Sequence, residues 1–252
     1  MANSTLDDLI RQHAPDAVAA RLKRNRAPHN MSDIVLGGVD GCITTFAIVT
    51  GAVGAGFPPY VSLILGIAKL FADALSMAVS NYESIKAHND FVAAMRREEE
   101  RHIEQVPEGE REEVRQIFAQ KGFADAALEH IVATITADRR LWIETMLAEE
   151  HGLHGPHPSP LKSGAVTFAA FVLIGVIPLL PLLITTLSIP TQLYASLALA
   201  GVVFFAIGTL KSVVFGRPAI KSGFATLLTG GSAAAVAYVI GYLLSEAFGI
   251  TG

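Results

Sequence analysis

The sequence predicts an all-α membrane protein with five transmembrane helices and an acidic three-helix domain inserted between the second and the third. The composition indicates the membrane, because 51% of the 252 residues are hydrophobic and only 17% are charged, with a mean hydropathy of +0.44. Soluble domains carry closer to a quarter charged residues. The charge is also unevenly distributed: residues 86–160 hold 15 of the 23 acidic side chains and six of the eight histidines.

The first residues are predicted to form a cytoplasmic N-terminal segment. They carry charges throughout and lack the apolar core of a cleavable signal peptide. Two interpretations stay open, a short amphipathic helix on the membrane surface and a poorly ordered tail. The helix is suggested by the apolar residues Leu6, Leu9, Ile10, Val18 and Leu22.

Two spans are predicted in the N-terminal third of the chain. Residues 34–57 are apolar except for Asp40, and residues 60–82 are apolar except for Lys69 and Asp73. Each segment holds the roughly 20 apolar residues that are needed to cross about 30 Å of hydrocarbon.

Three further spans are predicted in the C-terminal third, where segments of similar length lack every Asp, Glu, Lys, Arg and His. These segments are residues 164–190, 191–210 and 222–245. The chain therefore divides into an N-terminal segment (1–30), spans one and two (31–85), the acidic domain (86–160) and spans three to five (161–252).

Lysine and arginine in the connections predict the orientation. The N-terminal segment and the link at 211–223 are basic, whereas the links at 54–60 and 187–191 carry no charge. This alternation places the N-terminus and the acidic domain in the cytoplasm and, after five spans, the C-terminus outside. The alanine-rich, short-looped chain favours a bacterial inner membrane, with a vacuolar membrane as the alternative.

The acidic domain is predicted to contain three helices. The first continues out of span two, from residue 81 to about 105, and breaks at Pro107. The second runs over residues 108–121 and stops at Gly122, a usual C-terminal stop. The third is expected over residues 124–151.

Three pairs of potential metal ligands lie on these helices. Spacings of three or four residues place both members of a pair on one helix face, so the three helices could direct carboxylate, imidazole and thioether groups at a common space. Such a set suits Fe²⁺, Mn²⁺, Co²⁺ or Zn²⁺, and Glu-x-x-His on a helix holds ions in di-metal bundles. The pairs are Glu99 with His102, Glu110 with Glu113, and Met146 with Glu150.

The alternative for the acidic stretch is a solvated helix face. Glu98–Arg101 and Glu108–Arg111 could be exposed salt-bridge pairs, and the remaining glutamates of this stretch are interpreted as mostly solvating. The HGLHGPHP sequence (151–158) holds three histidines, but its glycines and prolines predict a flexible connector rather than a metal site.

Charged residues within the first two spans predict an ion path, because charge in a span is costly and usually functional. Asp73 and Met77 share a helix face, and a carboxylate with a thioether would select a softer divalent ion over Mg²⁺ or Ca²⁺. Asp40 could also exchange a proton, because burial disfavours its charged form. The alternatives are core packing for Met77, and a structural salt bridge of Lys69 with either aspartate.

Four motifs in order resemble the vacuolar iron transporter family: GGVDGCITTFAIVTG, FADALSMAVSNYES, REEERHIEQVPEGEREEV and ETMLAEEHGL. The resemblance, to a bacterial-type member, runs from about residue 30 to residue 245. It implies a five-span homodimer with the transport path at the subunit interface. It also implies a cytoplasmic three-helix metal-binding domain, and export of cytosolic Fe²⁺, often Mn²⁺ too, in exchange for protons.

The resemblance also assigns residues. It implies a membrane site of Asp40 and Met77, with Asp33 near the cytoplasmic mouth, and a cytoplasmic site made of the three ligand pairs. Two positions depart from the family pattern. His102 stands where better-known members carry a glutamate, which favours Zn²⁺, Co²⁺ or Ni²⁺. Lys69 stands where some members carry a carboxylate, so it could repel the ion or hold a neighbouring aspartate.

The predicted protein is thus a secondary-active transporter and not an enzyme. Divalent transition-metal ions are its substrate, with no prosthetic group and no catalytic residue, and its surroundings are the lipid bilayer and a second copy rather than nucleic acid. The alternative is a membrane-bound metal sensor, or a metal-storing, ferroxidase-like bundle. A sensor would not explain Asp40 and Met77, and a ferroxidase would need a second Glu-x-x-His, which residues 86–160 lack.

Overall fold

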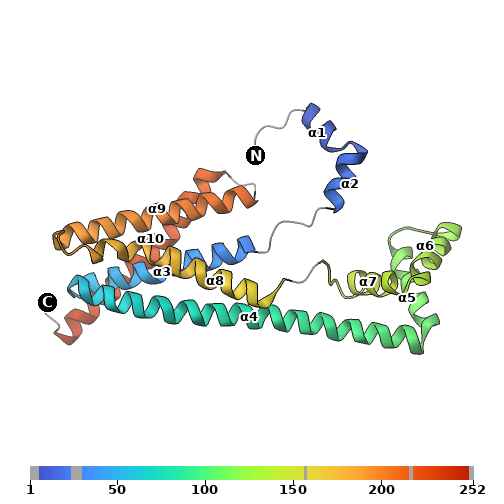
Figure 1. Cartoon of the computed structure of the whole chain (residues 1–252), viewed down its shortest axis with the longest axis horizontal. Coiled ribbons are helices and arrows are strands. Elements are labelled where there is room, and N and C mark those ends of the chain that lie inside the picture. Colours follow the sequence, from blue (N-terminus) through green and yellow to red (C-terminus); the bar gives the residue numbers. More distant parts are fainter. Residues whose placement is uncertain (1–5, 24–29, 156–157, 216–217, 250–252) are drawn as a thin grey trace. The chain divides into compact units, whose positions relative to one another are not determined.

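A computed structural model describes residues 6–23, 30–155, 158–215 and 218–249, and within these ranges every regular element is a helix. The chain divides into two compact units. One consists of Tyr82–Pro160, and the other of Met1–Asn81 together with Leu161–Gly252. The unit Tyr82–Pro160 is named the acidic unit, and the other unit is named the membrane unit. The helix α4 contributes residues to both (Figure 1).

Four helices of the described chain are long and apolar enough to cross a membrane: α3 (Asn30–Gly54), α4 (Pro59–Gln105), α9 (Ile189–Phe215) and α10 (Ala219–Phe248). A fifth crossing is possible if α8 (Pro160–Gly175) and the 3-10 helix η1 (Ile177–Leu183) count as one span. The all-α, multi-pass prediction is therefore confirmed, with four or five crossings by length and composition.

The predicted span over residues 164–190 corresponds to α8 and η1, which meet at an angle of 41° and do not form one continuous helix. Pro178 and Pro181 lack the N–H that continues an α-helix and clash with the preceding turn. Side chains of α9 bond to carbonyls near this break and at the C-terminal end of η1. Ser196 Oγ donates to the carbonyl of Pro178 at 2.5 Å, and Gln192 Nε2 donates to that of Ile184 at 2.9 Å.

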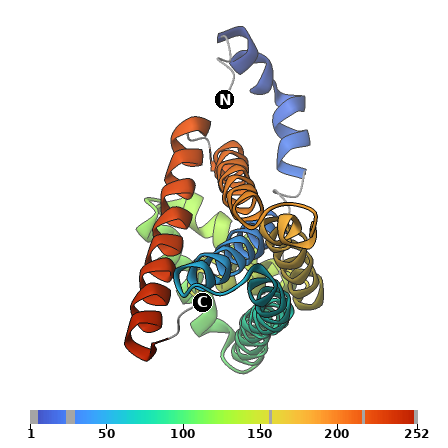
Figure 2. The same ribbon diagram turned by 90° about the vertical axis from the view of Figure 1, so that its left-hand side faces the viewer.

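Helix α3 occupies the middle of the membrane unit, where α4, α8, α9 and α10 surround it (Figure 2). Glycines permit this close approach. A Cβ at Gly41 would lie 2.4 Å from the carbonyl oxygen of Phe171 on α8, and one at Gly241 of α10 would lie 2.1 Å from that of Gly51 on α3. Small residues at helix contacts are the usual way in which membrane helices bring their backbones together.

The N-terminal segment holds two short helices, α1 (Leu6–Gln12) and α2 (Pro15–Lys23). Of the two alternatives for this segment, the structure has the helical one, but divided in two, because proline at the start of α2 cannot donate into a preceding helical turn. Leu6, Ile10 and Leu22 are exposed. Their placement on a membrane surface stays a prediction.

The acidic unit contains the end of α4 followed by α5 (Pro107–Gln120), α6 (Asp125–Ala137) and α7 (Arg139–Glu149). The predicted helix over residues 124–151 is thus two helices, and this expectation was wrong. Asp138 has extended backbone and caps α7, since its Oδ1 accepts from the N–H groups of Arg140 and Leu141 at 2.9 and 3.2 Å. The core between these helices consists of Val114, Leu128, Val132, Ile135, Trp142 and Met146.

Candidate metal centre

Two glutamates are buried in the acidic unit. The exposed fraction is 2% for Glu99 on α4 and 3% for Glu110 on α5. Burying a carboxylate is costly unless each oxygen finds a partner. Among the described residues, however, Oε2 of Glu99 and Oε2 of Glu110 have no hydrogen-bond partner. Both side chains therefore present an oxygen with an unused lone pair.

Each of these glutamates has an imidazole beside its other oxygen. His102 Nδ1 lies 3.4 Å from Glu110 Oε1, and His151 Nε2 lies 2.9 Å from Glu99 Oε1. Glu150 extends the group, with its Oε2 at 3.9 Å from His151 Nε2. The potential ligand atoms of Glu99, Glu150 and His151 all lie within 4.8 Å of one another.

The electrostatics of the cluster favour a bound cation. The pKa of Glu110 is raised from 4.5 to about 7, first by burial and then by the nearby charges of Glu113, Glu99 and Glu150 and by a contact with the Glu99 carboxylate. The pKa of Glu150 is raised as well, first by burial and then by Glu99 and Glu113. These carboxylates therefore repel one another when charged, and a divalent ion among them would relieve that repulsion.

Most members of the predicted ligand pairs lie near one another in the structure, and their role as metal ligands stays a prediction. Glu99, Glu110, Glu113 and Glu150 interact electrostatically, and His102 acts on Glu150. Met146 is placed differently from the others. It is fully buried in the hydrophobic core of the unit, one turn before Glu150. Its role as a thioether ligand stays a prediction.

His151 is a neighbour of Glu99 and Glu150 that the sequence analysis did not predict. The sequence analysis treated it as part of the HGLHGPHP connector because of the glycines and prolines there. In the structure His151 directly follows Glu150, the C-cap of α7, and its N–H bonds to the carbonyl of Met146 at 3.4 Å. The available signal was its position next to Glu150, a residue predicted to be a ligand.

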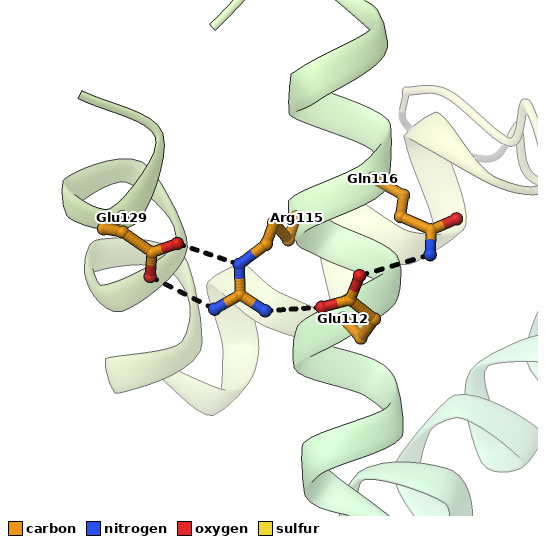
Figure 3. Close-up of polar contacts among 4 residues, drawn as sticks. All are labelled: Glu112, Arg115, Gln116 and Glu129. Carbon is orange, nitrogen blue, oxygen red and sulfur yellow. Dashed lines mark hydrogen bonds and ion pairs between the residues drawn. The ribbon is translucent and has the colours of Figure 1, made fainter. Parts of the chain in front are cut away.

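Other glutamates of the stretch are solvated, as expected. Arg115 on α5 bonds to Glu112 one turn earlier and to Glu129 on α6, and Gln116 also donates to Glu112 (Figure 3). The hydrogen bonds from Arg115 lower the pKa of both glutamates. Glu108 and Glu98 pair with Arg111 and Arg101 in the same exposed manner.

In the membrane unit, Lys69 pairs with Asp73. Lys69 Nζ lies 2.8 Å and 2.7 Å from the two carboxylate oxygens, on an exposed face of α4. Lys69 therefore forms its salt bridge with Asp73 and not with Asp40. Asp40 is half-buried on α3 and within electrostatic range of both members of the pair. Met77 is half-buried and packs against the cluster of Leu70, Ala74 and Phe171.

Asp33 is buried at the start of α3 and held by a residue that the sequence analysis did not single out. Asn81 Nδ2 of α4 lies 3.0 Å from Asp33 Oδ1 and 2.8 Å from Thr167 Oγ1 of α8. Asp33 Oδ2 has no hydrogen-bond partner among the described residues. A carboxylate with a free oxygen thus lies where three helices meet.

The chain resembles a known family over most of its length. The model of the VIT family matches residues 31–242. A vacuolar iron transporter of Toxoplasma gondii is 34% identical over 234 residues, which cover 89% of this chain and 78% of that protein. One of Plasmodium falciparum is 33% identical (86% and 83% covered). Vacuolar iron transporter 1 of Arabidopsis thaliana is also 33% identical (82% and 83% covered).

Proposed function

The chain belongs to the VIT family, and from this premise we propose that it moves Fe²⁺, or a related ion such as Mn²⁺, Co²⁺ or Zn²⁺, out of the cytosol in exchange for protons. As a member of this family it is an integral membrane protein with several spans and a transporter rather than an enzyme. The relatives carry iron in their names, and the donors described above suit the whole group of ions.

The observation that carries the proposal is the pair of buried glutamates with unpartnered oxygens. Glu99 and Glu110 each keep one carboxylate oxygen without a hydrogen bond among the described residues, with imidazoles beside the other. A solvated acidic face would leave both side chains exposed. In this proposal the acidic unit collects the cytosolic ion by electrostatic attraction and releases it to the membrane path.

The proposed path in the membrane unit uses Asp40 and Met77, with Asp33 near the cytoplasmic entrance. Asp40 exchanges the ion for a proton that arrives from the opposite side of the membrane. The Lys69–Asp73 pair holds Asp73 away from the ion, which leaves Asp40 as the acidic ligand. The N-terminus and the acidic unit face the cytoplasm, and the C-terminus lies outside, across a bacterial inner membrane or a vacuolar membrane.

The proposal includes a homodimer whose interface contains the path. Lys69 and Asp73 pair on an exposed side of α4, and Leu65, one turn before Lys69 on the same side, is exposed as well. Ionised groups that face lipid are costly, so a second copy of the chain covering this face would stabilise it.

Transport by the purified protein in liposomes tests the proposal. We expect Fe²⁺ uptake that depends on an imposed pH gradient, and its loss to background in Asp40→Asn. Glu112→Gln serves as the control, because Glu112 is exposed and paired with Arg115. In the detergent-solubilised Asp40→Asn protein, metal binding by the acidic unit should be unchanged, and only the binding that depends on Asp40 should be lost. If gradient-driven transport persists in Asp40→Asn, Asp40 is not part of the path. If the wild type transports none of the four ions, the proposed function is wrong.

A further inference from the structure

We propose that His151 is a metal ligand which, with Glu99 and Glu150, forms a mixed nitrogen and oxygen site. This ligand biases the acidic unit towards Co²⁺ and Zn²⁺ over Mn²⁺. The inference rests on the proposed function, because it adds a ligand for the ion that the protein moves. It assigns a role to a residue outside the three ligand pairs.

The end of α7 is built so that His151 turns back towards α4. Glu150 caps the helix, and the His151 N–H still bonds to the carbonyl of Met146. Gly152 then adopts a left-handed conformation with φ of 67°, and the N–H of Leu153 bonds to the carbonyl of Leu147 at 2.8 Å. Glycine reaches this conformation without the cost that a side chain would add. The imidazole therefore sits on a hydrogen-bonded helix end.

The distances suit a shared ion. Two ligand atoms about 2.1 Å from one ion lie roughly 3.0 Å apart at a right angle and roughly 3.4 Å apart at a tetrahedral angle. His151 Nε2 and Glu99 Oε1 are 2.9 Å apart, and His151 Nε2 and Glu150 Oε2 are 3.9 Å apart. Small side-chain rotations would place all three atoms around a single cation.

Glu99 supplies an independent indication of a ligand. Its side chain is 3% exposed, and its Oε2 has no hydrogen-bond partner among the described residues although Oε1 is bonded to His151. A buried carboxylate normally satisfies both oxygens. An ion bound between the two side chains would use this carboxylate and the Nε2 lone pair. The proton on Nε2 would leave to solvent as the ion enters.

A nitrogen donor changes which ions the site prefers. Imidazole binds Co²⁺ and Zn²⁺ well, whereas Mn²⁺ and Mg²⁺ prefer sites made of oxygen, and affinity rises from Mn²⁺ towards Zn²⁺ in the general order of these ions. His102, beside Glu110, adds a second nitrogen to the cluster. Removing His151 should therefore cost more affinity for Co²⁺ and Zn²⁺ than for Mn²⁺.

The test compares two histidines of one connector in the full-length protein. Purified wild type, His151→Gln and His154→Gln are titrated with Co²⁺, Zn²⁺ and Mn²⁺ by calorimetry, and the absorption bands of bound Co²⁺ are recorded. His154 is the matched control, because it is exposed and lies three residues further along. We expect His151→Gln to lower the Co²⁺ and Zn²⁺ affinities by about tenfold or more, to change Mn²⁺ less, and to shift the Co²⁺ bands. His154→Gln should leave all of these unchanged.

Three other results of these titrations would contradict different parts of the proposal. Equal affinities and an unchanged Co²⁺ spectrum in His151→Gln, with melting temperatures matched, would overturn the inference and leave the proposed function standing. If His151→Gln lowers the affinity for Mn²⁺ as much as the affinities for Co²⁺ and Zn²⁺, His151 does not bias the site towards Co²⁺ and Zn²⁺. If Glu99→Gln also keeps wild-type affinity for every ion, the acidic unit does not collect the ion and that part of the proposed function fails as well.

Discussion

At the scale of single residues, glutamates that are close together in the sequence of the acidic unit have different surroundings. Glu112 is exposed and is bonded to Arg115 and Gln116, whereas Glu110, two residues earlier, is buried. The difference lies in which face of α5 each side chain occupies. A charge on Glu110 is therefore costly in the absence of a cation, and a charge on Glu112 is not.

This cost leads to a prediction for Glu110→Gln in metal-free protein. The folded-state pKa of Glu110, about 7, lies above its ordinary value of 4.5, so the folded state binds the extra proton. The associated stability is present below pH 4.5 and is lost as the pH rises through 7. Glutamine stays neutral, so at pH 8 with chelator the variant should melt a few degrees above the wild type.

The comparison with pH 5 provides the control for Glu110→Gln. There the wild-type carboxyl is largely protonated, and the two proteins should melt within about a degree of each other by scanning fluorimetry. Glu113→Gln, at an exposed position, should show a smaller effect at pH 8. A lower melting temperature for Glu110→Gln at pH 8 would contradict the interpretation that its charge is poorly compensated.

At the scale of helices, the close contact between α3 and α10 depends on missing side chains. Gly241 touches backbone of α3, whereas a Cβ at Gly231 of the same helix would have nothing within 4 Å. The two glycines thus offer a matched pair on one helix.

We predict that Gly241→Ala destabilises the protein and that Gly231→Ala does not. The added methyl at Gly241 would meet a carbonyl oxygen at 2.1 Å, and overpacking costs typically 1–3 kcal/mol. Alanine at the open position should be neutral or stabilise by up to about 1 kcal/mol, because it favours the helix. Thermal unfolding in detergent measures both, and equal melting temperatures would show that α3 and α10 can move apart freely.

A second prediction at this scale concerns the start of α7. Asp138→Ala removes the side chain that accepts from two backbone N–H groups, which should lower the free energy of unfolding of the acidic unit by about 1 kcal/mol. Asp138→Asn retains the accepting oxygen and should recover most of that loss. If both substitutions cost the same in chemical denaturation, the cap is not what stabilises this end.

The periodicity of the sequence predicted most helices and which residues share a helix face. It did not predict where helices break or which residues from distant segments contact each other. Helix-borne pairs such as Glu110 with Glu113 are visible as spacings of three or four. The contact of Glu99 with His151 joins residues 52 apart, and no local pattern encodes it. The break at Asp138 was missed because the apolar periodicity continues across it. The bend at Pro178 had a visible signal in its proline, but the length of the apolar run outweighed it.

At the scale of the whole molecule, the proposed dimer makes a direct prediction. A single chain has a mass of 26.7 kDa, and native mass spectrometry of detergent-released protein should find twice this value. The only cysteine, Cys42, is fully buried, so the wild type should not cross-link. Ala72→Cys, on the exposed side of α4 next to Asp73, should form a disulfide-linked dimer in oxidised membranes, and its persistence as a monomer would oppose an interface at α4.

The bend between α8 and η1 has a consequence for how the protein is made. The carbonyl of Pro178 accepts from the hydroxyl of Ser196 on the following helix, and Ser196 leaves the ribosome later. Until then this carbonyl would face lipid without that partner, which is strongly disfavoured. We therefore expect this segment to wait at the translocon and enter the bilayer together with α9 as a hairpin. Glycosylation-site mapping of truncated nascent chains would show this as integration only after residue 196 has emerged, and would show delayed or failed integration in the variant Ser196→Ala.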